Sequence, residues 1–268
     1  MVLDFLKYYW RAKTVHQVHS EFVFNILQDV FDNTSFSQSL KLIEEKRTKL
    51  LKSNETIEVV DFGAGSKGSA SSQKTIRNIA KYAVSPPFQC LWLYHLVRSQ
   101  KINRVLELGT SLGITAAYLA QGNPHVHVTT IEGDPNISKK ANDLFDELHL
   151  KINGRCGQFN EVISDLLKSS NTYDLIYIDG HHAKIPTLEY TERLLPLLNS
   201  DGILIYDDIY WSEGMKEAWI EIKKRFAGSL TMDLFFWGIV IPSKTDIEPN
   251  EYTLIPQKWK PLQIGIWQ

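Results

Sequence analysis

The sequence predicts an α/β fold: a doubly wound, mostly parallel sheet of seven strands with helices on both faces, preceded by a mainly helical N-terminal region. From residue 102 onward, short apolar runs alternate five times with longer amphipathic segments, the pattern of a parallel sheet covered by helices. Two further β-rich segments follow within residues 230–242, around Gly238. Before residue 102, the apolar spacing is helical and is interrupted by polar turns.

Size and composition are those of an ordinary soluble protein. The chain has 268 residues, 43% apolar and 22% charged, which is enough for one large domain or one domain with a substantial addition. We divide it into an N-terminal helical extension or lid (1–100), a core domain (101–242) and an aromatic C-terminal tail (243–268) packed on that domain. Two widely separated cysteines and the absence of a signal-like N-terminus predict a cytoplasmic protein.

The N-terminal region contains three predicted helices, within residues 5–13, 20–31 and 39–51, and Ser20 is placed to cap the second. Residues 57–62 could form a short strand before a Gly/Ser-rich loop. Two more helices are then expected, separated by a pair of prolines that ends the first of them. These two helices span residues 74–83 and 88–99.

The five repeats from residue 102 each combine a predicted strand with a predicted helix. The strands are 104–109, 125–132, 152–158, 173–179 and 202–208. The helices are 114–121, 136–150, 160–169, 187–198 and 213–226.

Two glycine turns compete for the role of cofactor site, one after Asp61 and one after Glu107. In a doubly wound fold, the strand after the cofactor turn should end in a carboxylate about 20 residues on, where it binds the ribose hydroxyls. Glu132 meets this requirement for the second turn. For the first turn the corresponding window holds neither an acid nor a strand, so we assign the cofactor to the second.

The second turn also indicates which cofactor binds. The spacing of Gly109 and Gly113 is not the Gly-x-Gly-x-x-Gly of dinucleotide sites, and Glu107 would repel a pyrophosphate. An acid at that position suits a cationic ligand, such as the ammonium group of a methionine moiety near a sulfonium. The cofactor predicted on this basis is S-adenosylmethionine.

The series VLELGTSLGITAAYLA, VTTIEGDP, YDLIYIDGHH and DGILIYDDI resembles the Rossmann-like class I S-adenosylmethionine-dependent methyltransferases. It looks most like their small-molecule O-methyltransferase branch, of the catechol, caffeoyl-CoA and macrocin type, over residues 102–242. The N-terminal extension resembles that of a bacterial subgroup, especially from Bacteroidetes. The resemblance implies a cofactor site formed by Glu107, Gly109, Thr110, Ser111, Gly113, Glu132, Gln158, Phe159 and Asp179.

Three acids end the fourth and fifth predicted strands of the core: Asp179, Asp207 and Asp208. Oxygen ligands converging from neighbouring strand ends suit Mg²⁺, which would bind a substrate hydroxyl and lower its pKa. Metal-dependent members of the branch that the chain resembles use acids at these strand ends. Otherwise, Asp179 would contact the cofactor or substrate directly, and the other two acids would cap the following loop.

The catalytic base is expected near Asp179. The catechol branch places a lysine three residues beyond this aspartate, where the present chain has His182, with His181 beside it. A histidine titrates near neutral pH and can take a proton from a hydroxyl. Either histidine could therefore replace the lysine as base in a metal-independent reaction on an N or O acceptor, or serve a structural role.

The acceptor is predicted to be a small molecule. An acid-free stretch between Asp61 and Glu107 favours an anionic acceptor, unless its bases only form solvated helix faces. The seven bases are Lys67, Lys74, Arg77, Lys81, Arg98, Lys101 and Arg104.

The sequence argues against two other enzyme classes and against nucleic-acid and membrane partners. A net charge of −2 and the lack of a base-flipping motif argue against a nucleic-acid methyltransferase, and no membrane partner is expected. The lack of Gly-x-Gly-x-x-Gly argues against a nicotinamide-dependent oxidoreductase. The aromatic tail could pack on its own domain or on a second copy, which would make a homodimer.

Overall fold

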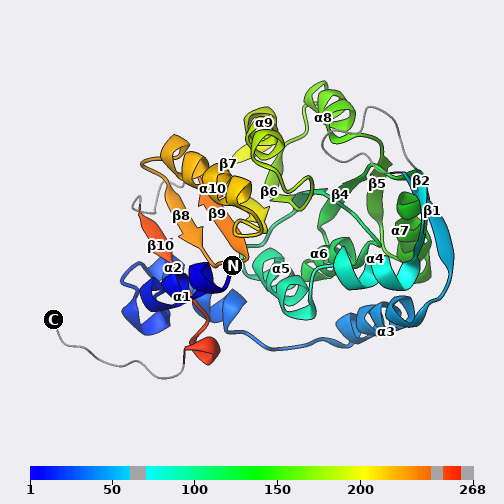
Figure 1. Cartoon of the computed structure of the whole chain (residues 1–268). Helices are drawn as coiled ribbons and strands as arrows, with labels where there is room; N and C mark the ends of the chain where they lie inside the picture. Colours follow the sequence, from blue (N-terminus) through cyan, green and yellow to red (C-terminus); the bar gives the residue numbers. More distant parts are fainter. Residues whose placement is uncertain (61–70, 243–249, 261–268) are drawn as a thin grey trace.

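The computed structural model describes residues 1–60, 71–242 and 250–260. A central sheet has helices on both faces, and the N-terminal helices lie against one side of it (Figure 1). In the described residues the sheet has eight strands in the order β10-β8-β9-β7-β6-β3-β4-β5. The predicted doubly wound α/β fold is therefore confirmed.

Five of the strands are mutually parallel and correspond to the five predicted repeats. They are β3 (Arg104–Leu108), β4 (His127–Glu132), β5 (Ile152–Cys156), β6 (Tyr173–Ile178) and β7 (Leu198–Asp207). The chain then reverses, because β9 (Trp237–Ile241) pairs antiparallel with both β7 and β8 (Leu230–Asp233).

The count of seven strands is corrected to eight, because β10 (Glu251–Thr253) pairs parallel with β8. Three residues are too short a run for alternation to reveal a strand, so this segment was assigned to the tail. A separate antiparallel pair joins β1 (Thr56–Val60) to β2 (Ser71–Thr75). The strand predicted at residues 57–62 is thus confirmed as far as Val60. The end of the predicted Gly/Ser-rich loop forms β2 instead. Residues 61–70, which contain the rest of that loop, lie outside the described ranges.

Helices alternate with the strands as predicted. They are α1 (Val2–Arg11), α2 (Glu21–Ile26), α3 (Gln38–Lys52), α4 (Ile76–Tyr82), α5 (Pro87–Ser99), α6 (Ile114–Gly122), α7 (Pro135–Glu147), α8 (Phe159–Leu167), α9 (Lys184–Leu194) and α10 (Glu213–Arg225). Short irregular helical turns are η1 (Val15–Gln17), η2 (Leu27–Phe31), η3 (Leu195–Leu197) and η4 (Gln257–Trp259). None of the helices in the described part of the chain has the length and hydropathy needed to cross a bilayer.

Each face of the sheet has its own hydrophobic core. On one face, alternate residues such as Val105 and Ile205 pack with α5, α6 and α7. On the other face, residues such as Leu106 and Leu204 pack with α8, α9 and α10. This division follows from the alternation of side chains along a strand and places the loops that follow the strands at one edge.

The N-terminal region shares the first of these cores. Val23 and Leu27 are fully buried in the same cluster as Leu93 and Trp237. Two segments far apart in the sequence also meet, because the backbone N–H of Ile255 donates to the carbonyl of Lys13 over 3.0 Å. Residues 1–52 are therefore built into the body of the molecule.

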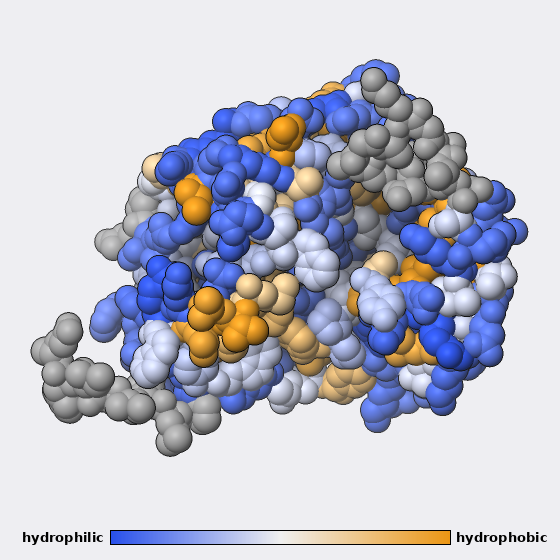
Figure 2. All heavy atoms as spheres, viewed as in Figure 1, coloured by the Kyte–Doolittle hydropathy of each residue, from blue (hydrophilic) through white to orange (hydrophobic). Residues whose placement is uncertain are grey.

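The outer face of α1 is apolar as well as exposed. Apolar side chains gather over this helix on the surface in Figure 2. The exposed apolar residues of α1 are Val2, Leu3, Leu6 and Trp10. Since Tyr8 on the opposite side is buried, α1 is apolar on two sides, and only one of them packs against the rest of the chain.

We predict that Trp92→Ala lowers the free energy of unfolding by about 3–5 kcal/mol. Trp92 is 1% exposed, its Nε1 donates to the carbonyl of Phe31 over 3.1 Å, and its ring contacts Trp237 edge-on at 5.4 Å. Urea unfolding measures the loss. Trp211→Ala, at a site 62% exposed, is the matched control and should change stability by no more than about 0.5 kcal/mol.

Candidate active site

The site lies at the edge of the sheet where the parallel strands end. The neighbours of β3 are β4 on one side and β6 on the other, so the strand order reverses at β3. A crevice forms outside the carboxyl ends of strands at such a reversal, and it is the usual ligand site of doubly wound folds. The segments that follow β3, β4, β6 and β7 all reach this edge.

The turn after β3 approaches the end of β6 so closely that it requires glycine. Gly109 has φ +103°, and a Cβ there would overlap the carbonyl oxygen of Asp179. The backbone N–H of Asp179 also donates to the carbonyl of Leu108 over 2.9 Å. At the start of α6, Gly113 has φ +81° and its Cβ position is filled by the ring of Phe145. Both glycines are needed to close the turn.

Glu107 is fully buried at the end of β3. Its Oε2 accepts a hydrogen bond from the Thr130 hydroxyl over 2.5 Å, and Thr130 pairs with the Thr110 hydroxyl over 2.6 Å. Burial raises the pKa of Glu107 well above its usual value. Its Oε1 has no hydrogen-bond partner among the described residues, and this leaves a buried acceptor available for a donor on a ligand.

Glu132 ends β4 and is held by two backbone donors. Its Oε2 accepts from the N–H of Ser111 over 2.9 Å, and its Oε1 accepts from the N–H of Asp134 over 3.0 Å. Burial raises its pKa, although these N–H groups oppose the rise. The carboxyl group is therefore fixed beside the glycine turn.

Phe159 follows β5 and lies against the backbone that follows β6. A Cβ at Gly180 would come within 2.7 Å of the Phe159 ring, so the two segments are in close contact. The ring also meets Tyr190 edge-on at 5.6 Å. Gln158, by contrast, is exposed at the start of α8 and does not line the crevice.

The three predicted catalytic acids meet at the ends of β6 and β7. Asp179 accepts from the hydroxyls of Ser85 and Tyr177, each over 3.3 Å. The carboxyl groups of Asp179 and Asp207 lie close enough to influence each other's pKa. Burial, together with the charges of Asp179 and Asp208, raises the pKa of Asp207 well above its usual value. Two neighbouring carboxyl groups disfavour each other's ionisation, because the second negative charge is repelled by the first.

These acids do not form a metal site as they stand. Within the described ranges, no group of three or more His, Cys, Asp or Glu side chains is placed to hold a metal ion. Asp207 and Asp179 are close enough to affect each other's ionisation, and Asp208 follows with φ +55°. The donor types suit Mg²⁺, but their arrangement does not match it.

The two candidate histidines lie in different surroundings. Nε2 of His182 is 3.6 Å from Oδ1 of Asp179, and its side chain lines the crevice. His181 has φ +59° and its Nδ1 is 3.4 Å from the Tyr190 hydroxyl. His181 does not line the crevice.

The crevice encloses a cavity of about 570 Å³, which we call the acidic cavity. Five of the predicted site residues line it: Gly109, Ser111, Glu132, Phe159 and Asp179. His182, Asp207 and Asp208 complete the catalytic end. The sequence did not identify the opposite wall, which comes from α4 and the turn after it, the start of α5 and the β8–β9 turn. This wall contains Ile79, Tyr82, Ala83, Val84, Ser85, Pro86, Gln89 and Phe236.

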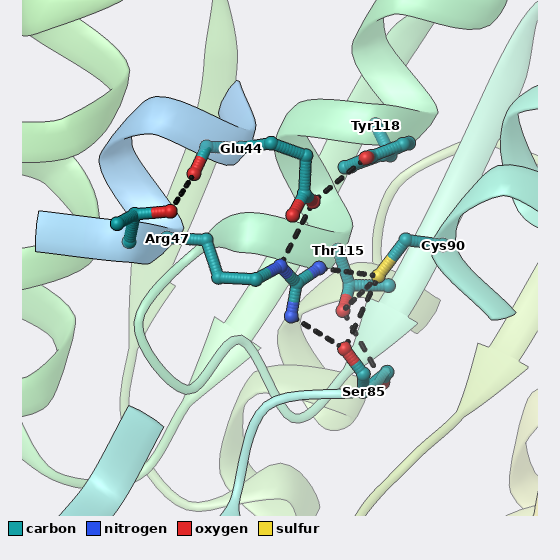
Figure 3. A network of polar contacts seen from close by, with 7 residues as sticks. Glu44, Arg47, Ser85, Cys90, Thr115 and Tyr118 are labelled. Atoms are coloured by element: carbon teal, nitrogen blue, oxygen red, sulfur yellow. Dashed lines mark hydrogen bonds and ion pairs between the residues drawn. The ribbon is translucent and has the colours of Figure 1, made fainter. Parts of the chain in front are cut away.

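Ser85 connects this wall to the N-terminal helices through a buried network (Figure 3). Arg47 of α3 is 6% exposed and donates to the Ser85 carbonyl over 2.7 Å and to the Cys90 sulfur over 3.2 Å. Its Nε also donates to Glu44 over 2.8 Å. Burial raises the pKa of the Cys90 thiol to about 11, so the sulfur stays a neutral part of the network. The only signal for Ser85 was its place before a proline pair, which indicates a helix start and nothing about chemistry.

We expect Arg47→Gln to lower the free energy of unfolding by roughly 3 kcal/mol, because the Ser85 carbonyl and Glu44 lose a buried charged donor. Chemical denaturation provides the measurement. Arg77→Gln removes an exposed arginine that bonds only to Asn54 among the described residues, and it should cost less than about 0.5 kcal/mol. Equal losses in the two variants would contradict the importance of the network.

Residues 106–209 match a protein family described as "Methyltransferase domain". A protein-L-isoaspartate O-methyltransferase from Bradyrhizobium sp. is 30% identical over 125 residues, covering 46% of this chain and 52% of that protein. The O-methyltransferase ankF from Aspergillus thermomutatus is 29% identical over 137 residues, covering 47% of this chain and 54% of the relative. The chain thus spans about half the length of the curated relatives it matches.

Solved structures share the fold over more of the chain. An O-methyltransferase from Bacillus cereus in complex with SAH has a TM-score of 0.55 at 17% identity, covering 78% of this chain and 92% of that one. The SAH-bound Podospora anserina methyltransferase PaMTH1 has a TM-score of 0.57 at 14% identity and covers 91% and 95%. At such identities the likeness establishes the fold alone.

Proposed function

We propose that this chain, which carries a methyltransferase domain of the Rossmann-like, S-adenosylmethionine-dependent kind, transfers a methyl group from S-adenosylmethionine to an oxygen of a small molecule. One observation carries the proposal. The Glu132 carboxylate is fixed by Ser111 and Asp134 beside the Gly109 turn, in the same cavity as Asp179 and His182. Cofactor-binding and proton-accepting groups therefore share one space.

The residues around the acidic cavity fit the cofactor. Glu132 is placed for the ribose hydroxyls, since carboxylate oxygens accept such donors. Phe159 offers an apolar ring for the adenine, whereas the buried Glu107, which was predicted to lie at the methionine part, does not line the cavity. When bound, S-adenosylmethionine supplies an electrophilic methyl group. The remaining task of the chain is to hold the acceptor hydroxyl and take its proton.

His182 is the residue that we assign to that task. It lines the cavity, and the Asp179 carboxylate 3.6 Å away can orient its ring and stabilise its charged form. His181 lies against Tyr190 instead and has no access to the cavity. The metal-assisted alternative would need Asp179, Asp207 and Asp208 to rearrange, since these acids do not form a metal site in the described structure.

The cavity favours a neutral or cationic acceptor over the anionic one predicted from the basic stretch. Its described lining contains four acids and no lysine or arginine. Lys74, Arg77 and Lys81 are exposed and do not line the cavity, and Lys67 lies outside the described residues. Val84, Pro86 and Phe236 would contact an apolar part of the acceptor.

We expect Glu132→Gln to weaken S-adenosylhomocysteine binding by roughly tenfold to a hundredfold, because charged hydrogen bonds to the ribose are worth about 1.5–3 kcal/mol. Isothermal titration calorimetry measures the affinity. Glu45→Gln, an exposed acid on α3, is the matched control and should bind normally. Binding of NADH without binding of S-adenosylhomocysteine would mean that the chain is an oxidoreductase instead.

His182→Asn should lower kcat by about 10²–10⁴-fold, because a positioned base contributes this much, with little change in KM. His181→Asn should retain most of the activity. The assay follows S-adenosylhomocysteine release with a panel of neutral, cationic and anionic hydroxylated compounds. Excess EDTA should leave the rate unchanged, whereas loss of activity in EDTA that Mg²⁺ restores would support the metal-assisted mechanism instead.

A further inference from the structure

A second cavity lies at the opposite edge of the sheet, where β3, β4 and β5 begin. Its volume is about 400 Å³, within the range of small-ligand sites, and it shares no lining residue with the acidic cavity. We call it the basic cavity because four basic side chains line it: Arg104, His127, Lys151 and Arg155.

The strand register places these basic residues on one face of the sheet. Arg104 pairs with His127, and Ile131 pairs with Arg155. Since side chains two residues apart point to the same side of a strand, all four basic residues share the face that packs against α8. Further along that face, Leu106 and Ile131 are covered by Val162 and Leu166 of α8. Helix α8 ends at Leu167, and the basic cavity opens where this cover stops.

The side chain of Arg104 is held in place without an anionic partner among the described residues. Its guanidinium lies over the ring of Tyr173, 5.8 Å from the ring centroid, and Tyr173 is 3% exposed. Its Nε–H is buried and has no acceptor in the described part of the chain. Buried donors are nearly always satisfied, so an unpaired one at the wall of a cavity indicates a missing acceptor.

The other cations of the basic cavity are also free to bind. Neither Lys151 nor Arg155 forms an ion pair with any residue in the described ranges. The single acid in the lining, Asp165, is paired with Lys168 at 2.9 Å. Asn153 and Ser169 add neutral hydrogen-bonding groups. The cavity therefore has an excess of positive charge. Its arginine guanidinium groups can form bidentate hydrogen bonds with an oxyanion.

We propose that the basic cavity binds a small anion carrying phosphate or carboxylate groups, at a site separate from the cofactor and acceptor. An oxygen of the anion would accept from the buried Nε–H of Arg104, and Arg155 and Lys151 would contact the remaining oxygens. The site is independent of the reaction at the acidic cavity, because β3 separates the two edges by roughly 13 Å at about 3.3 Å per residue.

The test is calorimetric titration of the full chain with pyrophosphate and with citrate, in a buffer free of phosphate. We expect one saturable site for at least one of the two, and the better binder identifies phosphate or carboxylate as the preferred group. Saturating S-adenosylhomocysteine should leave this affinity unchanged. Competition between the two ligands, or no saturable binding up to about 10 mM, would overturn the proposal.

Variants locate the site. Arg155→Gln and Arg104→Gln should each weaken anion binding about tenfold, as expected for loss of a charge-assisted hydrogen bond. Lys41→Gln removes an equal charge from the exposed side of α3 and should have no effect. If Arg104→Gln fails to fold, Arg155→Gln on the edge strand β5 still tests whether the anion binds in the basic cavity. Unchanged binding in both arginine variants, or displacement of the anion by a tighter-binding oligonucleotide, would contradict a small-anion site.

Discussion

The close approach of two strand ends determines the whole site. Because Gly109 has no Cβ, the turn after β3 can rest on the carbonyl of Asp179 at the end of β6. This contact joins two segments that are 70 residues apart in sequence, at the point where the strand order reverses. The groups suited to the cofactor lie on the β3–β4 side of it, and the acids proposed for the catalytic end lie on the β6–β7 side. A bulkier residue at 109 would separate the two halves.

The second wall of the site depends on the N-terminal region. Ser85 donates to Asp179 through its hydroxyl, while its carbonyl is held by Arg47. Arg47 comes from α3, so a helix that precedes the segment matching the methyltransferase family supports the residue that touches Asp179. The N-terminal helices therefore support this wall from outside the cavity. Their burial in the core with Trp237 has the same consequence.

The sequence predicted the parts of the site that depend on local pattern. Gly109 and Glu132 were predicted because glycine turns and strand-end acids have fixed spacing in doubly wound folds, and both line the acidic cavity, whereas Glu107 does not. Ser85, Gln89 and Phe236 were missed, since their role arises only when distant segments pack together. β10 was missed because three residues carry no periodic signal. The sequence also could not show that His182 lines the cavity and His181 does not, because this difference depends on backbone geometry, in this case the positive φ of His181.

The near-neutral net charge conceals a separation of charge across the sheet. Arg104 begins β3 and Glu107 lies three residues further along it, so one short strand has a base near one edge and an acid near the other. The sequence showed a run of bases without acids and suggested an anionic acceptor. In the structure, one base of that run, Arg104, lines the basic cavity, while the cavity with Asp179 and His182 is lined by acids. The direction of the strand decides which edge of the sheet each charge reaches, so a run of bases in the sequence does not by itself place positive charge at the nearest site.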